Sequence, residues 1–133
     1  MASWTDVRRI VLALPKTTEE RASTGRLWWF AGKKTIALQR PLRRSDIVAL
    51  GDKAPRGPIL CVRTPDLEMK AVLLASEPDV IFTTPHFDGY PAVLIQLKKI
   101  GVRKLRQIIL EAWLEIAPKR AVAEYLQDKA SRQ

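Results

Sequence analysis

A chain of 133 residues with 47% hydrophobic and 28% charged residues has the composition of a soluble globular protein, long enough for one core and too short for two. Its longest apolar runs are four or five residues, far below the roughly 20 that span a bilayer, and its start lacks the apolar segment of a signal peptide, so a cytoplasmic protein without membrane association is expected. The net charge of +9, from 23 basic and 14 acidic residues, favours polyanionic partners.

The first part of the chain predicts a helix followed by a loop. Apolar residues repeat at helical spacing over residues 3–14, with Ser3 as a capping residue and Pro15 as the end of the helix. Residues 16–25 have no apolar period and contain several charged residues. This segment is therefore expected to be a surface loop.

A β-hairpin is expected over residues 26–39. Two runs rich in aromatic and branched residues flank Gly32 and Lys33, which predicts a two-residue turn. That turn would place Trp29 opposite Ile36. Because the first strand is apolar on both faces, we expect it inside the sheet and not at its edge.

The rest of the chain predicts three more strands and four helical segments. The strands are expected at 59–63, 80–83 and 91–97, and the helical segments at 46–50, 64–76, 102–116 and 118–126. Short and moderate connections favour antiparallel pairing. The sequence therefore predicts a single α+β domain over residues 1–133, with an antiparallel sheet of about five strands and helices largely on one face.

Basic residues gather in two segments of the chain. Residues 33–63 carry eight basic and two acidic side chains, and residues 98–106 carry five basic and no acidic ones. The leading hypothesis is therefore a nucleic-acid-binding protein, with DNA as the expected partner, that contacts the phosphate backbone. The candidate contact residues are Lys33, Lys34, Arg40, Arg43, Arg44, Lys98, Lys99, Arg103, Lys104 and Arg106. The alternative, that these charges form an ordinary solvated surface, stays open.

Neither a catalytic residue nor a metal site is expected. His86 is the only histidine, and nucleophilic catalysis would require it to lie beside a nucleophile such as Cys61, a pairing that the sequence leaves open. One Cys and one His are too few for zinc, and no Gly-rich phosphate loop is present. Glu19 and Glu20 could hold a cation, although solvation is favoured. We therefore expect a protein that is not an enzyme and has no cofactor.

The aromatic residues support an alternative hypothesis. Most of these rings are expected in the core. The loop 84–90 and the hairpin aromatics could instead form a concave pocket for a small ligand or a protein partner, with Trp28, His86 and Tyr90 as its candidate residues. A deep pocket at these residues would favour this hypothesis, and basic segments on opposite sides of the molecule would weaken the nucleic-acid one.

Several segments together resemble a known family. They are Ala13-Leu14-Pro15, Phe30-Ala31-Gly32-Lys33-Lys34, the stretch 78–97 with His86-Phe87-Asp88-Gly89-Tyr90-Pro91, and Glu111-Ala112-Trp113 followed by Ala117-Pro118-Lys119-Arg120. In order and spacing they are similar to the MmcQ/YjbR-like family of small bacterial proteins, over nearly the whole chain. The resemblance implies an antiparallel α+β fold of the CyaY or frataxin type and a DNA-binding label based on a double-wing likeness. Frataxin-like iron handling relies on an acidic ridge that begins on the first helix, where this chain has Asp6 beside Arg8 and Arg9, so iron binding is not expected.

Overall fold

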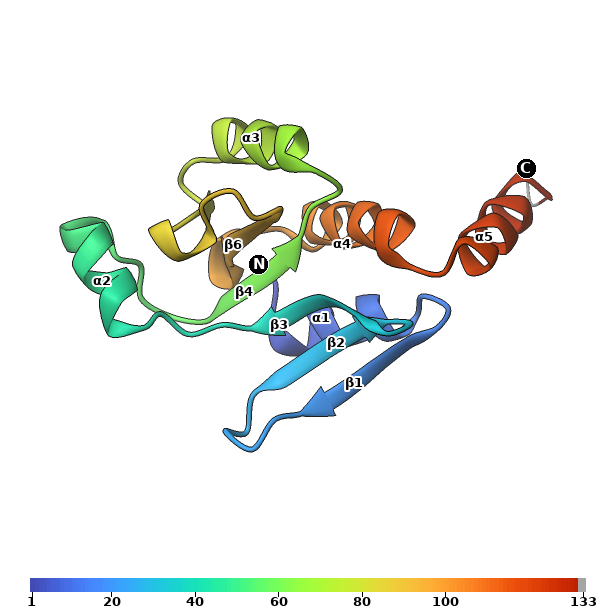
Figure 1. Cartoon of the computed structure of the whole chain (residues 1–133), viewed down its shortest axis with the longest axis horizontal. Helices are drawn as coiled ribbons and strands as arrows, with labels where there is room; N and C mark the ends of the chain where they lie inside the picture. The colour runs from blue at the N-terminus through green and yellow to red at the C-terminus, as the bar shows by residue number, and fades with distance from the viewer. Residues whose placement is uncertain (132–133) are drawn as a thin grey trace.

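The computed structural model describes residues 1–131 as a six-stranded sheet with helices around it (Figure 1). In chain order the elements are α1 (Trp4–Leu12), β1 (Thr17–Arg21), β2 (Leu27–Ala31), β3 (Lys34–Gln39), α2 (Arg44–Leu50), β4 (Ile59–Arg63), α3 (Leu67–Ser76), β5 (Ile81–Phe82), β6 (Ala92–Gln96), α4 (Val102–Ile116) and α5 (Lys119–Ser131), with short 3₁₀ helices η1 (Gly51–Lys53), η2 (Pro85–Phe87) and η3 (Leu97–Lys99). The strand order is β1-β2-β3-β4-β6-β5, and every neighbouring pair is antiparallel. The α+β class and the antiparallel sheet are as predicted, with one strand more than expected.

The additional strand is β1, which lies in the segment 16–25 where the sequence predicted a loop. It pairs with β2 along its whole length and forms one edge of the sheet. The hydroxyl of Thr17 donates to the carbonyl oxygens of Val11 and Leu14, both at 2.8 Å, and so ties the strand to the end of α1. The prediction was wrong because residues 17–21 lack the alternation of apolar and polar side chains by which a strand is recognised in a sequence. Polar contacts with α1 hold this strand instead.

The β2–β3 hairpin has the predicted turn but a different register beyond it. Gly32 has a φ of 63°, and Ala31 pairs with Lys34 across the two-residue turn. A β-bulge between Trp29 and Phe30 then places Trp29 opposite Ala37 and not opposite Ile36. Because the bulge leaves Ile36 as an extra residue, two successive side chains of β3 reach the main core. β2 lies inside the sheet, as its two apolar faces predicted.

The two faces of the sheet are covered unequally. Helices α1 and α4 pack against one face, where the main core contains the fully buried Trp29 and Trp113. On the other face a smaller cluster lies beneath η2, formed by Ile59, Cys61, Phe87, Ala92 and Leu94. Trp28 and Phe30 of β2 are only half-buried on this face. The helices thus lie largely on one side, as predicted, and the opposite side, here called the open face, is left partly uncovered.

None of the helices within residues 1–131 is long and apolar enough to cross a bilayer.

Candidate functional site

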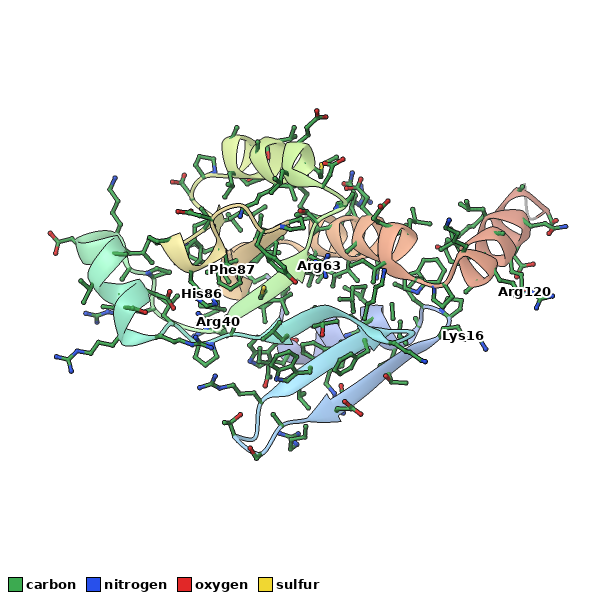
Figure 2. The ribbon with its side chains drawn as sticks, viewed as in Figure 1. Lys16, Arg40, Arg63, His86, Phe87 and Arg120 are labelled. Carbon is green, nitrogen blue, oxygen red and sulfur yellow. The ribbon has the colours of Figure 1, made fainter. Side chains whose placement is uncertain are left out.

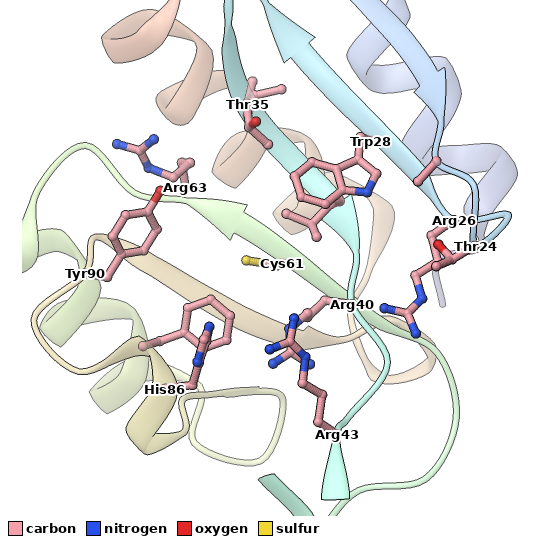
Figure 3. A pocket seen from close by; sticks show the side chains of 14 residues that line it. Thr24, Arg26, Trp28, Thr35, Arg40, Arg43, Cys61, Arg63, His86 and Tyr90 are labelled. Carbon is pink, nitrogen blue, oxygen red and sulfur yellow. The ribbon is translucent and has the colours of Figure 1, made fainter. Parts of the chain in front are cut away.

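A cavity of about 370 Å³ lies on the open face of the sheet (Figure 3). Its floor consists of Trp28 from β2, Leu38 from β3 and Cys61 from β4. The η2 segment contributes His86 to the wall, and Tyr90 follows shortly after it. Trp28, His86 and Tyr90, which the sequence nominated for a pocket, therefore all line one cavity, although Trp28 and the 84–90 loop are far apart in the sequence.

Four arginines also line this cavity, and none of its lining residues within the described chain is acidic. They are Arg26, Arg40, Arg43 and Arg63. Arg40 directly follows β3 and Arg63 ends β4, so the antiparallel pairing places them at opposite ends of the floor. Figure 3 shows the guanidinium groups of Arg40 and Arg43 pointing into the same part of the cavity, near His86. The cavity is therefore strongly cationic.

Arg40 is the most deeply buried of the four arginines, with 3% of its surface exposed. Its Nη1 atom lies 3.1 Å from Oδ2 of Asp46 and donates to the carbonyl oxygen of Pro41 at 2.6 Å. The guanidinium group also lies over the ring of Phe87, 5.4 Å from its centroid (Figure 2). Nη2 is buried as well but has no hydrogen-bond partner among the described residues. Arg40 is thus held in one orientation with one donor group unused.

Asp46 is the counterion of Arg40 and is itself 2% exposed. Its carboxylate also accepts a hydrogen bond of 2.8 Å from the backbone amide of Arg43. Burial opposes ionisation of this carboxyl, but the Arg43 amide and the charge of Arg40 outweigh that effect and lower its pKa. Asp46 therefore stays ionised at neutral pH and offsets one of the positive charges at the site.

The opposite end of the cavity is formed by Arg63 and Tyr90. The Arg63 guanidinium lies over the Tyr90 ring, 5.1 Å from its centroid, a cation–π arrangement. The Nε atom of Arg63 is buried and has no hydrogen-bond partner within residues 1–131. This end therefore combines a flat aromatic surface with a second unused donor.

A buried lysine fixes the η2 wall to α3. Lys70 is 7% exposed, and its ammonium group donates to the carbonyl oxygens of Phe87 and Tyr90 at 2.6 and 2.7 Å. Burial lowers the pKa of Lys70, against the opposing charge of Asp88. Sequence reasoning did not find this residue, because a lysine within a helix normally faces solvent.

Cys61 lies in the floor of the cavity as a neutral thiol. Burial raises its pKa to about 11, although the charges of Arg40, Arg63 and Lys70 act in the opposite direction. No hydrogen bond joins Cys61 to His86 in the described chain. Because a protonated thiol is a poor nucleophile, this part of the cavity behaves as an apolar surface.

Glu19 is occupied by other contacts. Its carboxylate pairs with Arg8 through two hydrogen bonds of 2.9 Å and accepts another, of 2.8 Å, from the indole of Trp29. The hydrogen bond from Arg8 is the main reason that the pKa of Glu19 is lowered. Groups of three or more His, Cys, Asp or Glu residues suited to a metal ion do not occur within residues 1–131.

The basic residues nominated for nucleic-acid contacts are distributed over both ends and both faces of the sheet. Lys33 and Lys34 are exposed at the β2–β3 turn, whereas Arg43 and Arg44 lie past the other end of β3. Lys98 and Lys99 belong to η3, and Arg103, Lys104 and Arg106 to α4, which packs on the face opposite the cavity. Among these ten residues only Arg40 forms an ion pair with a described residue.

Fold and cavity together define a small α+β domain with a cationic pocket on its open face. No family model matches the chain. The uncharacterized proteins Rv2570 and MT2646 of Mycobacterium tuberculosis and Mb2600 of Mycobacterium bovis are each 50% identical to it over 129 residues, which are 95% of this chain and 97% of each relative. The chain belongs to the family of these mycobacterial proteins.

A solved structure shares the fold. The crystal structure of Deinococcus radiodurans protein DR2400, described as a DUF419 domain, has a TM-score of 0.62 and 18% sequence identity, and the match covers 86% of this chain and 78% of that chain. At this identity the likeness establishes the common α+β architecture alone.

Proposed function

We propose that this protein is a small-ligand-binding domain whose ligand occupies the cavity on the open face. One observation carries the proposal: Trp28 of β2 lines one cavity of about 370 Å³ together with His86 and Tyr90 of the distant 84–90 loop. Small-molecule sites typically measure about 300–1,000 Å³ and combine apolar walls with a few polar groups. The floor and the arginines of this cavity fit that description.

The proposal is for binding without catalysis. The only cysteine is a neutral buried thiol, and no hydrogen bond activates it through His86 within the described chain. Four of the residues that line the cavity are arginines, whose guanidinium groups bind and orient a ligand and do not exchange protons at neutral pH. A cytoplasmic location and membership of the MmcQ/YjbR-like family, with its CyaY-like sheet, are parts of the same proposal.

The test is an NMR titration with a mixed library of small aromatic and aliphatic fragments. The indole of Trp28 lines the cavity, whereas the indole of Trp113 donates to the carbonyl oxygen of Pro15 in the core at 2.9 Å. We expect bound fragments to shift the Trp28 indole resonance, assigned with Trp28→Phe, and to leave that of Trp113 unchanged. A library in which no fragment, charged or neutral, shifts Trp28 would contradict the proposal.

Nucleic-acid binding is the second candidate function. It is supported by the net charge of +9 and by exposed basic residues without ion pairs to described residues, such as Lys33 and Lys34. It ranks second because these residues are spread over both faces of the sheet, where one duplex would engage only some of them. If about five phosphates are neutralised, the logarithm of the affinity should fall with the logarithm of the salt concentration with a slope of about −4.5. The affinity should then fall about 500-fold between 50 and 200 mM salt. A salt slope near zero, or binding that Lys33→Glu with Lys34→Glu leaves unchanged, would exclude it.

A further inference from the structure

We infer that the ligand of this cavity is an organic oxyanion with a flat apolar body, and that Arg40 and Arg43 bind its charged group. The inference rests on the proposed function and adds to it the chemical class of the ligand. The anionic group is a carboxylate or a phosphate, since a fork of guanidinium donors fits both.

The guanidinium group of Arg40 is fixed in place and has a donor without a partner within residues 1–131, which favours an anionic ligand. Asp46, Pro41 and the ring of Phe87 fix its guanidinium group, so the orientation exists before any ligand binds. Nη2 is buried without a partner among the described residues, although Arg40 lines the cavity. A buried charged donor is stable only when it meets an acceptor, and an anionic oxygen is the strongest acceptor available to it.

The lining of the cavity carries an excess of positive charge, which also favours an anionic ligand. Arg43 adds its guanidinium group beside that of Arg40, and Arg26 and Arg63 add two more positive charges to the lining (Figure 3). Asp46 offsets one of these charges, and none of the described lining residues offsets the others. Like charges brought together in a partly buried site repel, and a bound anion relieves that repulsion. A neutral or cationic ligand would leave it in place.

The floor of the cavity defines the rest of the ligand. Trp28, Leu38 and the neutral thiol of Cys61 form an apolar surface between the arginines. The ring of Tyr90, stacked on Arg63, closes the far end. An inorganic anion would leave this surface uncovered, whereas a flat apolar body would bury it.

The experiment is isothermal titration calorimetry of the full chain with four probes: benzoate, phenyl phosphate, benzamide and inorganic phosphate. Benzamide has the shape of benzoate without its charge. We expect benzoate, phenyl phosphate or both to bind at least about tenfold more tightly than benzamide and inorganic phosphate. The tighter of the two anions identifies the charged group as a carboxylate or a phosphate.

Substitutions then assign the site. Arg43→Gln should weaken binding of the preferred anion at least about fivefold and leave benzamide unchanged. Arg44→Gln is the matched control, because Arg44 is an exposed neighbour that does not line the cavity. Arg40→Gln should have a larger effect than Arg43→Gln, and circular dichroism shows whether that variant is folded. Arg43→Gln provides the test if it is not.

Two results would overturn the inference in distinguishable ways. Equal affinity for benzamide and for both organic anions, benzoate and phenyl phosphate, unchanged by Arg43→Gln, would mean that the cavity binds small ligands but does not select anions. In that case the proposed function survives. If none of the four probes binds, the inference is wrong, and if no fragment of the library shifts the Trp28 resonance either, the proposed function is wrong as well.

Discussion

Replacement of Asp46 by Asn should destabilise the protein strongly, because it leaves the buried Arg40 without its counterion. The side chains of Arg40 and Asp46 are 4% and 2% exposed, so solvent cannot substitute for the lost charge. Breaking a buried ion pair by removing one partner typically costs about 3–5 kcal/mol. Asn keeps an acceptor for the Arg43 amide, so we expect the lower end, about 3 kcal/mol, which is a large part of a typical total of about 5–15 kcal/mol.

Urea unfolding followed by circular dichroism measures this effect. With an m-value of about 1–3 kcal/mol/M, the midpoint should fall by about 1–3 M while m stays constant. The pair Arg120–Glu124 is the control, with side chains 93% and 72% exposed and 3.9 Å between them. Glu124→Gln should leave the midpoint unchanged, because exposed pairs contribute little. An unchanged midpoint for Asp46→Asn as well would refute the account of Arg40.

A double-mutant cycle measures the interaction energy between Arg40 and Asp46 separately from the effect of each substitution at its own site. Arg40→Met alone should also be costly, because it leaves the buried Asp46 without its counterion while the hydrogen bond from the Arg43 amide remains. The double variant Arg40→Met with Asp46→Asn should cost clearly less than the sum of the single changes, because neither buried charge then remains. Strict additivity would mean that the two groups do not interact.

The pH dependence gives an independent check with a definite sign. The folded state lowers the pKa of Asp46 below its ordinary value, so the unfolded chain takes up this proton first as the pH falls. The stability from Asp46 is therefore complete above the ordinary aspartate pKa of about 3.9 and is lost as the pH falls through the lower folded value. The difference in the free energy of unfolding between the wild type and Asp46→Asn should therefore become smaller in that pH range. A gap that stays constant down to about pH 2.5 would contradict the lowered pKa.

Two further substitutions test the wall of the cavity and the hairpin. Lys70→Met removes the two donors that hold the 84–90 segment, so we expect a loss of about 2–3 kcal/mol in urea unfolding and faster amide exchange in that segment. Unchanged exchange there would mean that Lys70 does not hold the wall. Gly32→Ala should cost about 1–2 kcal/mol, because Gly32 has a φ of 63° and the added Cβ would lie 3.1 Å from Cγ of Pro118. Gly25→Ala, with a φ of 89° and no atom within 4 Å of its Cβ, should cost less, and equal losses would refute the role of Pro118.

Most of the elements could be predicted from local patterns. Helical spacing of apolar residues marked α1 and α4, and apolar runs marked β2, β3, β4 and β6. Such patterns succeed where an element buries one face or both. They failed for β1, whose contacts with α1 are polar, and for the bulge at Trp29, which depends on how the core accommodates Ile36 and Ala37.

The candidate pocket residues were predicted in part. Trp28, His86 and Tyr90 were nominated because the 84–90 loop and the hairpin aromatics could form a concave pocket, and all three line the cavity. Arg26 and Arg63 were not nominated. Arg63 had a signal that could have been used, since it places a charge at the end of an otherwise apolar strand.

Composition and periodicity by themselves determined the α+β class, the interior position of β2 and the excess of positive charge. Only the tertiary structure decided where that charge acts. Arg40 and Arg44 are near neighbours in sequence, yet one is buried against Asp46 and the other is exposed. Arg40 and Arg63 instead line the same cavity, because antiparallel pairing of β3 with β4 brings their side chains onto one face of the sheet. The direction of a side chain depends on strand register and on neighbours far along the chain, and local sequence does not contain that information.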